Sequence, residues 1–220
     1  MSNTITTTNF NFPGQKSVYR GKVREVYTID NKHLVMIASD RLSAFDQIVA
    51  VVPYKGQVLN QLAAWWFANT TDIIGNHIVS LPDQNATIAK GATPLPVEVV
   101  VRGVMTGSTS TSIWKQYEQG KREIYGYSFA DGITKNTLLP EASITPTTKG
   151  DTGAHDEPLT NSEVVDRGLV DAATWATVQK AAFSLFARGQ QIAQRAGLLL
   201  ADTKYEFGTL PHGEVIIIDE

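Results

Sequence analysis

The strongest pattern in the chain is an apolar stripe between residues 171 and 196. Seven residues recur there at steps of three and four positions: Trp175, Val178, Ala182, Leu185, Gly189, Ile192 and Ala196. This spacing is typical of one face of an α-helix, and Gly197 follows where a glycine commonly ends a helix. We therefore expect a long amphipathic helix that buries one face.

Other segments show the two-residue alternation of strands. Residues 17–27 alternate Val and Tyr with polar residues, and residues 34–38 and 97–101 are short β-rich runs. Residues 198–218 predict a terminal hairpin, while residues 56–69 and 108–119 have helical spacing. The fold class expected from this mixture is α+β.

Two lobes are expected, with their boundary near residues 93–97. Residues 1–93 would form a small, antiparallel, β-rich lobe, and residues 94–220 a larger α+β lobe. Between these elements, residues 131–163 are rich in Gly, Pro, Thr and charge. They predict a long irregular segment, which is uncommon unless it is functional or mobile.

Composition restricts the function classes. The net charge is −3 and the pI is about 5.8, so no basic excess indicates nucleic acid or an anionic membrane as partner. Any bound anion must be held by a few placed cations. Cysteine is absent, which excludes disulfides, thiolate metal sites and a cysteine nucleophile. The N-terminus has no signal-peptide pattern and no run is long enough to span a membrane, so a cytoplasmic protein is expected.

The run ADTKYEFG places Asp202, Lys204 and Glu206 two residues apart. On a strand these three charges share one face. A solvated surface is the simplest explanation. The alternative is a nucleotide cation site, since Mg²⁺ uses one or two carboxylates together with phosphate oxygens. Glu206 and Asp219, on opposite strands of the predicted hairpin, would supply those carboxylates.

Two N-terminal stretches are candidates for anion binding. Gly21 and Lys22 lie at a predicted β-bend, where backbone N–H groups and a lysine can approach a phosphate; a simple β-bulge at Gly21 is the alternative. In SDRLSAFD, a buried strand leads directly to Arg41, a residue suited to bidentate capture of phosphate or carboxylate. Alternatively, Asp40 or Ser43 caps a short helix.

Two later stretches carry similar chemistry. Arg102 ends a predicted strand, and Ser108 opens a predicted helix, whose N–H groups favour an anion. The segment TPTTK, followed by the residues HDE at 155–157, suits a loop that closes over a polar substrate. A structural turn and a mobile surface loop are the respective alternatives. One histidine at this spacing is a poor metal site.

Taken together, GKVREVY, SDRLSAFD, YKGQVLNQ, VEVVVRG with TGS, TPTTK with HDE, and ADTKYEFG resemble the phosphoribosylaminoimidazole-succinocarboxamide synthase (SAICAR synthetase) family, in order from residue 17 to residue 220. The resemblance implies a two-lobed α+β fold related to protein kinases and the ATP-grasp group, in which residues 1–93 are the nucleotide-binding lobe and residues 94–220 carry the substrate site. It implies an ATP-dependent ligase that joins L-aspartate to the carboxylate of carboxyaminoimidazole ribonucleotide (CAIR) in purine synthesis. ATP and Mg²⁺ are the implied cofactors, and the partners are small molecules.

The resemblance also implies roles for individual residues. Those expected to contact ATP are Gly21, Lys22 and Arg24 in a phosphate loop and Glu98 near the adenine. Those expected to bind Mg²⁺ are Glu206 and Asp219. The expected catalytic pair, Asp202 and Lys204, contacts the imidazole. The remaining substrate contacts are Arg102 and Ser108 for the ribonucleotide, Arg41, Ser43 and Asp46 in a substrate loop, and His155 and Asp156 near the aspartate pocket.

Family members continue beyond the residues IDE into a segment whose arginine helps to bind the substrate phosphate. By this resemblance, the 220 residues alone are expected to bind ATP but to show little or no synthetase activity. Two other functions remain open: an ATP-dependent kinase of a polar metabolite, and a nucleotide-binding module without catalysis.

Overall fold

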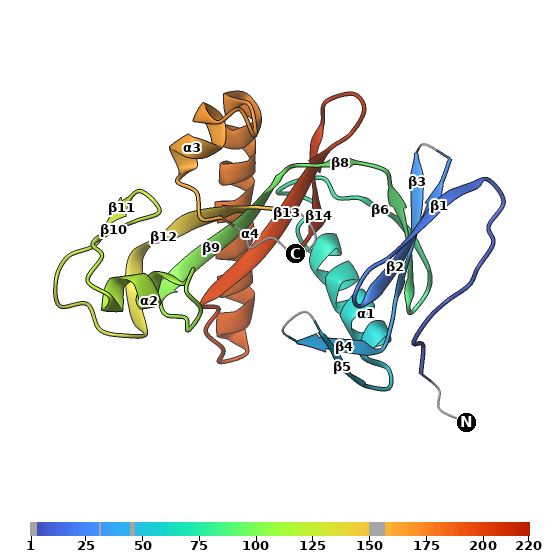
Figure 1. Ribbon diagram of the computed structural model, residues 1–220, viewed down its shortest axis with the longest axis horizontal. Helices are drawn as coiled ribbons and strands as arrows, with labels where there is room; N and C mark the ends of the chain where they lie inside the picture. Colours follow the sequence, from blue (N-terminus) through green and yellow to red (C-terminus); the bar gives the residue numbers. More distant parts are fainter. Residues whose placement is uncertain (1–3, 31, 45–46, 150–156) are drawn as a thin grey trace. The chain divides into compact units, whose positions relative to one another are not determined.

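The computed structural model describes residues 4–30, 32–44, 47–149 and 157–220. The chain forms two compact units (Figure 1). Unit 1 contains the residues up to Thr93 together with Thr209–Ile216, and unit 2 contains Pro94–Gly208 and Ile217–Glu220. The second change of unit therefore lies inside the terminal hairpin.

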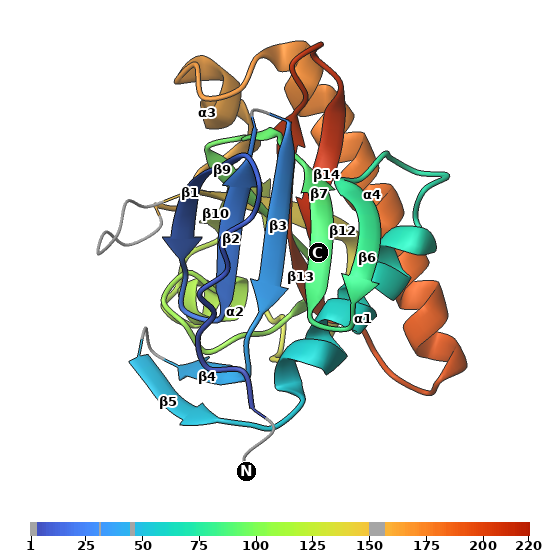
Figure 2. The same ribbon diagram turned by 90° about the vertical axis from the view of Figure 1, so that its right-hand side faces the viewer.

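Unit 1 is built on an antiparallel five-stranded sheet (Figure 2). In spatial order its strands are β1 (Gln15–Arg20), β2 (Arg24–Ile29), β3 (His33–Ala38), β7 (Ala86–Lys90) and β6 (Ile78–Asp83). The predicted bend at Gly21 and Lys22 is confirmed as the connection between β1 and β2, and the β-bulge of this pair lies at Gln15 and Ser17 instead. A separate small hairpin consists of β4 (Arg41–Ala44) and β5 (Gln47–Val51).

The helix of unit 1, α1 (Lys55–Ala68), packs against β3 through a very close approach of the two backbones. A Cβ atom on Gly56 would lie 2.5 Å from the carbonyl oxygen of Ala38, so only glycine fits at this position. The Gly56 N–H donates to Asp40 Oδ1 at 2.9 Å. Asp40 therefore holds the first turn of α1, but Arg41–Ala44 form β4 and not the short helix that Asp40 or Ser43 was considered to cap.

Unit 2 is also built on an antiparallel sheet, in the order β12-β9-β13-β14. These strands are β12 (Thr137–Thr148), β9 (Val97–Met105), β13 (Asp202–Thr209) and β14 (Val215–Asp219), and the short β8 (Thr93–Pro94) pairs with β13. The smaller elements are α2 (Ile113–Glu118), β10 (Glu123–Ile124), β11 (Tyr127–Ser128) and α3 (Asn161–Asp166). The predicted hairpin is confirmed, although its first strand begins at Asp202 rather than at residue 198.

The predicted long helix is α4 (Ala172–Arg195), which packs on β9 and β12 (Figure 1). Of the predicted stripe, Ile192 is half-buried and Ala196 exposed, whereas the other five members are buried. Gly197 follows with φ +72°, the left-handed conformation typical of a glycine after a helix. The α+β fold class, with antiparallel sheets, is thus confirmed.

The prediction of an irregular segment over residues 131–163 was wrong. Residues Thr137–Thr148 form β12, which pairs along β9 with an irregularity between Leu138 and Ser143. The strand is rich in Thr and Pro, so its composition resembles a loop. Its segment from Ser143 to Thr147 is nevertheless buried, because β9 and α4 provide the surfaces that cover it. No helix in the described part of the chain is long and apolar enough to cross a membrane.

Candidate active site

Lys204 lies at the centre of a charged cluster on the sheet of unit 2. Its Nζ lies 2.5 Å from Glu206 Oε1, 3.2 Å from Glu98 Oε1 and 3.7 Å from Asp219 Oδ2. These three carboxylates come from β13, β9 and β14, which are adjacent strands. The strand face that carries Lys204 and Glu206 is therefore a built ionic cluster, not a solvated surface.

The charges of this cluster stabilise one another. Burial alone would lower the pKa of Lys204, but the carboxylates of Glu206, Glu98 and Asp219 raise that pKa above its ordinary value. Burial alone would raise the pKa of Glu206, but hydrogen bonds from Lys149 and Lys204 lower it. Lys149 is thus a second cation of the cluster, paired with Glu206. This pair could not be predicted from the sequence, because 57 residues separate Lys149 from Glu206.

Arg102 forms the second charged group of unit 2. It is 9 % exposed and lies on β9 directly opposite Asp202 of β13. Its Nη1 donates to Asp202 Oδ2 at 3.3 Å and its Nε donates to Thr145 Oγ1 at 2.9 Å. Strands on both sides of β9 thus hold the guanidinium in place.

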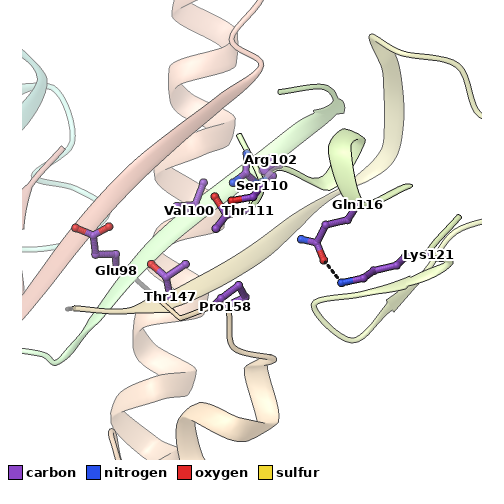
Figure 3. Close-up of a pocket in the computed structure, with 9 residues that line it drawn as sticks. All are labelled: Glu98, Val100, Arg102, Ser110, Thr111, Gln116, Lys121, Thr147 and Pro158. Carbon is purple, nitrogen blue, oxygen red and sulfur yellow. Dashed lines mark hydrogen bonds between the residues drawn. The ribbon is translucent and has the colours of Figure 1, made fainter. Parts of the chain in front are cut away.

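A pocket of about 650 Å³ lies beside this face (Figure 3). Its lining residues are Glu98, Val100, Arg102, Ser110, Thr111, Gln116, Lys121, Thr147 and Pro158. Glu98, Val100 and Arg102 alternate along β9, so they share one face of the strand. The pocket consequently has an acidic end at Glu98, beside Lys204, and a basic end at Arg102.

Several pocket residues were not predicted from the sequence. The Lys121 Nζ donates to Gln116 Oε1 at 3.2 Å, as Figure 3 shows, and the hydroxyls of Ser110 and Thr111 also line the pocket. Ser108, the predicted contact of the ribonucleotide, is exposed and is not among the lining residues. The run of Ser and Thr residues from 108 to 112 indicates a hydroxyl-rich segment, but its sequence does not reveal which of these hydroxyls face the pocket.

Most of the other predicted contacts lie in unit 1. Gly21, Lys22 and Arg24 form the tight turn between β1 and β2, closed by a hydrogen bond from Gly21 N–H to the Arg24 carbonyl at 2.9 Å. Arg41 was expected in a substrate loop, but it is buried, and each of its three guanidinium nitrogens donates to a group inside unit 1. Ser43 is half-buried on β4. Asp46, His155 and Asp156 lie outside the described residues.

A divalent cation would suit the Lys204 cluster. No group of three or more His, Asp or Glu side chains in the described part of the chain forms a complete metal cage. Glu206 and Asp219 nevertheless converge on the same ammonium, which shows that a cation is favoured between them. Two carboxylates with hard oxygen donors fit Mg²⁺, which completes its coordination with water and phosphate oxygens.

A pocket that contains a buried arginine and borders, through Glu98, on the ionic cluster of Lys204 fits a protein that binds small anionic molecules. Comparisons with known proteins agree with this class. The sequence model of the family described as SAICAR synthetase matches residues 17–220. The chain belongs to this family.

Individual relatives give the same result. A putative phosphoribosylaminoimidazole-succinocarboxamide synthase 2 of Agrobacterium fabrum is 52 % identical over 94 % of this chain and 66 % of its own length. The phosphoribosylaminoimidazole-succinocarboxamide synthase of Flavobacterium psychrophilum is 46 % identical over 99 % of this chain and 68 % of its own length. The chain therefore spans about two thirds of the length of these relatives.

Among solved structures, the SAICAR-synthase of Saccharomyces cerevisiae complexed with SAICAR matches with a TM-score of 0.84 and 29 % identity. The match covers 98 % of this chain and 76 % of the yeast chain. A second structure, titled SAICAR synthase, matches with a TM-score of 0.82 and 28 % identity over the same shares of the two chains.

Proposed function

We propose that the protein containing this chain is an ATP-dependent ligase that joins L-aspartate to the carboxylate of CAIR. The products are SAICAR, ADP and phosphate. Membership of the SAICAR synthetase family supports the proposal, as does the yeast relative whose structure contains SAICAR. The observation that carries it within this chain is the polarity of the unit 2 pocket, from Glu98, which pairs with Lys204, to Arg102.

This polarity matches the chemistry of the reaction. A carboxylate does not accept an amine until it is activated, so the γ-phosphoryl group of ATP is first transferred to the CAIR carboxylate oxygen, giving an acyl phosphate and ADP. The neutral amine of aspartate then attacks the acyl carbon and the amide bond forms. Phosphate leaves with the former carboxylate oxygen and takes up the proton that the amine releases. In the first step negative charge builds up on the transferring phosphoryl group and on the departing ADP, and in the second on the oxygen of the tetrahedral intermediate. Placed cations stabilise the charge in both steps.

Unit 2 offers groups for each part of CAIR. The Lys204 ammonium, held beside Glu98 and Glu206, would neutralise the carboxylate as it accepts the phosphoryl group. Asp202 would accept a hydrogen bond from a polar group of the imidazole. Arg102, at the basic end of the pocket, would hold the ribose phosphate, since a guanidinium suits that group. Fixing both ends of the substrate orients its carboxylate for reaction.

Other residues would contact ATP and its metal ion. Gly21, Lys22 and Arg24 would contact the ATP phosphates, and Glu98 would lie near the nucleotide. Glu206 and Asp219 would hold Mg²⁺, which when bound neutralises charge on the phosphates. Lys149 and Lys204, which now pair with Glu206, would exchange part of this pairing for contacts with the bound anions.

The test is an ADP-release assay on the natural protein that carries this sequence, with CAIR, aspartate and Mg²⁺–ATP, omitting each in turn. Release that requires all three, together with a succinyl amide product identified by mass spectrometry, supports the ligase. A phosphorylated product formed without aspartate would indicate a kinase. ATP binding without turnover of any of these substrates would indicate a nucleotide-binding module instead.

A further inference from the structure

Arg41 lies behind the Gly21–Arg24 turn and contacts its backbone. Its Nη2 donates to the carbonyl oxygen of Gly21 at 2.9 Å, and its Nε donates to that of Lys22 at 2.8 Å. The side chain is 7 % exposed, so these bonds are shielded from water. Both come from one planar group and therefore fix two successive peptide units relative to each other.

The next carbonyl of the turn is held in the same way. Both the backbone N–H and the hydroxyl of Ser39 donate to the carbonyl oxygen of Val23, at 2.9 and 2.8 Å. Three successive carbonyls, those of Gly21, Lys22 and Val23, are thus drawn towards the segment containing Ser39 and Arg41. No cis peptide bond occurs among the described residues.

The direction of these carbonyls determines that of the N–H groups. In a trans peptide unit the C=O and N–H bonds point in opposite directions. Each carbonyl that turns towards Ser39 or Arg41 therefore turns the N–H of the following residue away from them. Successive N–H groups on one side of a turn form a concavity for anions, and the side chains of Lys22 and Arg24 add positive charge there.

A buried network holds Arg41 from its other side. Its Nη1 donates to Glu25 Oε1 at 3.2 Å and also to the carbonyl oxygen of Thr6. Glu25 is 1 % exposed and accepts from the Thr8 N–H at 2.9 Å and from the Thr8 hydroxyl. Glu25 on β2 thus neutralises the guanidinium, and Thr6 and Thr8 of the N-terminal segment help to orient it, which leaves its other edge directed at the turn.

We propose that Arg41 is a positioning residue for the phosphate groups of ATP, acting through the backbone of the Gly21–Arg24 turn rather than by touching substrate. This inference rests on the proposed function, because it takes ATP as the ligand of the turn. It differs from the role expected from the sequence, in which Arg41 contacts substrate. The guanidinium fork is the required feature, since a lysine at this position retains the charge but offers no planar pair of donors.

The test compares ATP with adenosine, which lacks phosphates, by calorimetry on the natural protein that carries this sequence. Arg41→Lys should weaken the affinity for Mg²⁺–ATP about tenfold and leave that for adenosine unchanged, because only the phosphates contact the turn. The KM for ATP should rise while the KM for the ribonucleotide stays constant. Ser39→Ala, which removes one of two bonds to the Val23 carbonyl, should have the same effect at roughly twofold.

Thr87→Val is the matched control. It removes the hydrogen bond from the buried Thr87 hydroxyl to Asn60 Oδ1 and leaves Arg41, Ser39 and Glu25 with all their contacts, so it should lower the melting temperature and leave the ATP affinity unchanged. If Arg41→Lys and Ser39→Ala bind ATP as tightly as the unaltered protein, the inference is wrong but the proposed function stands. The same holds if the variants lose affinity for ATP and for adenosine equally. If the unaltered protein binds neither ligand, the proposed function fails and the inference fails with it.

Discussion

Lys204 Nζ lies 3.2 Å from Glu98 Oε1, although 106 positions separate the two residues in the sequence. The pairing of β13 with β9 brings them together, since Lys204 lies opposite Val100, two residues beyond Glu98. With Glu206 and Asp219, they place one ammonium among three carboxylates. Removing a partner from such a cluster leaves a partly buried charge without compensation, so both binding and stability should respond.

The first prediction concerns the proposed metal ligand Glu206. Glu206→Gln keeps the shape of the side chain but removes one of the two carboxylates available to Mg²⁺. We expect the affinity for Mg²⁺–ATP to fall at least tenfold, measured by calorimetry, with a smaller effect on thermal unfolding. Asp202→Asn, a change outside the metal pair on the same strand, is the control. Normal Mg²⁺–ATP binding by the Glu206 variant would refute the assignment.

The second prediction concerns Arg102 at the basic end of the pocket. Arg102→Ala removes a charged hydrogen-bond donor, and such a bond contributes about 1.5–3 kcal/mol. The KM for CAIR should therefore rise on the order of tenfold to a hundredfold, while the KM for ATP stays nearly constant. Steady-state kinetics with each substrate varied in turn measures both values. An equal rise for ATP would show that Arg102 does not distinguish the two substrates.

The third prediction concerns acid stability and Glu163 of α3. The Thr160 N–H, the Arg167 guanidinium and the Thr160 hydroxyl lower the pKa of Glu163 from 4.5 to about 2. A carboxylate whose pKa is lower in the folded state stabilises the fold fully above its unfolded pKa, and this contribution disappears as the pH falls between these two values. Urea unfolding of Glu163→Gln should therefore show a shallower loss of stability over this range. Parallel profiles for the variant and the unaltered protein would contradict the prediction.

The fourth prediction concerns the close contact of α1 with β3. Gly56→Ala would place a Cβ atom 2.5 Å from the Ala38 carbonyl oxygen and 2.6 Å from Asn85 Nδ2. Because backbone on β3 cannot move without disturbing the sheet, we expect a loss of about 1–3 kcal/mol in the free energy of unfolding. Gln61→Ala, at an exposed position of the same helix, should have little effect. If Gly56→Ala left the free energy of unfolding unchanged, α1 would be able to shift away from β3 without cost, contrary to the prediction.

The regular elements were predictable because their patterns are local. The stripe from Trp175 to Gly189 marked α4, and the alternation around Gly21 marked the first hairpin. Strand β12 was missed because its Thr and Pro residues resemble a loop until β9 pairs with them. The role of Arg41 was equally hidden, since its partners are backbone carbonyls 19 and 20 residues away, which no side-chain pattern reveals.

Lys149 illustrates the same limit at the site. It was expected only as part of the TPTTK segment, in a loop that closes over a polar substrate. Its pairing with Glu206 depends on β12 and β13 lying on opposite sides of β9. The strand face with Asp202, Lys204 and Glu206 could be read directly, because a two-residue period fixes its geometry. Which residues contact that face depends on strands that are far away in the sequence.

The return of residues 209–216 to unit 1 has a consequence for synthesis of the protein. Unit 1 begins at the N-terminus, but about 115 residues of unit 2 must leave the ribosome before its last segment is available. At about 5–20 residues per second, the nascent unit 1 waits several seconds in an incomplete form. A fragment that ends at Thr93 would therefore lack residues 209–216, which belong to unit 1.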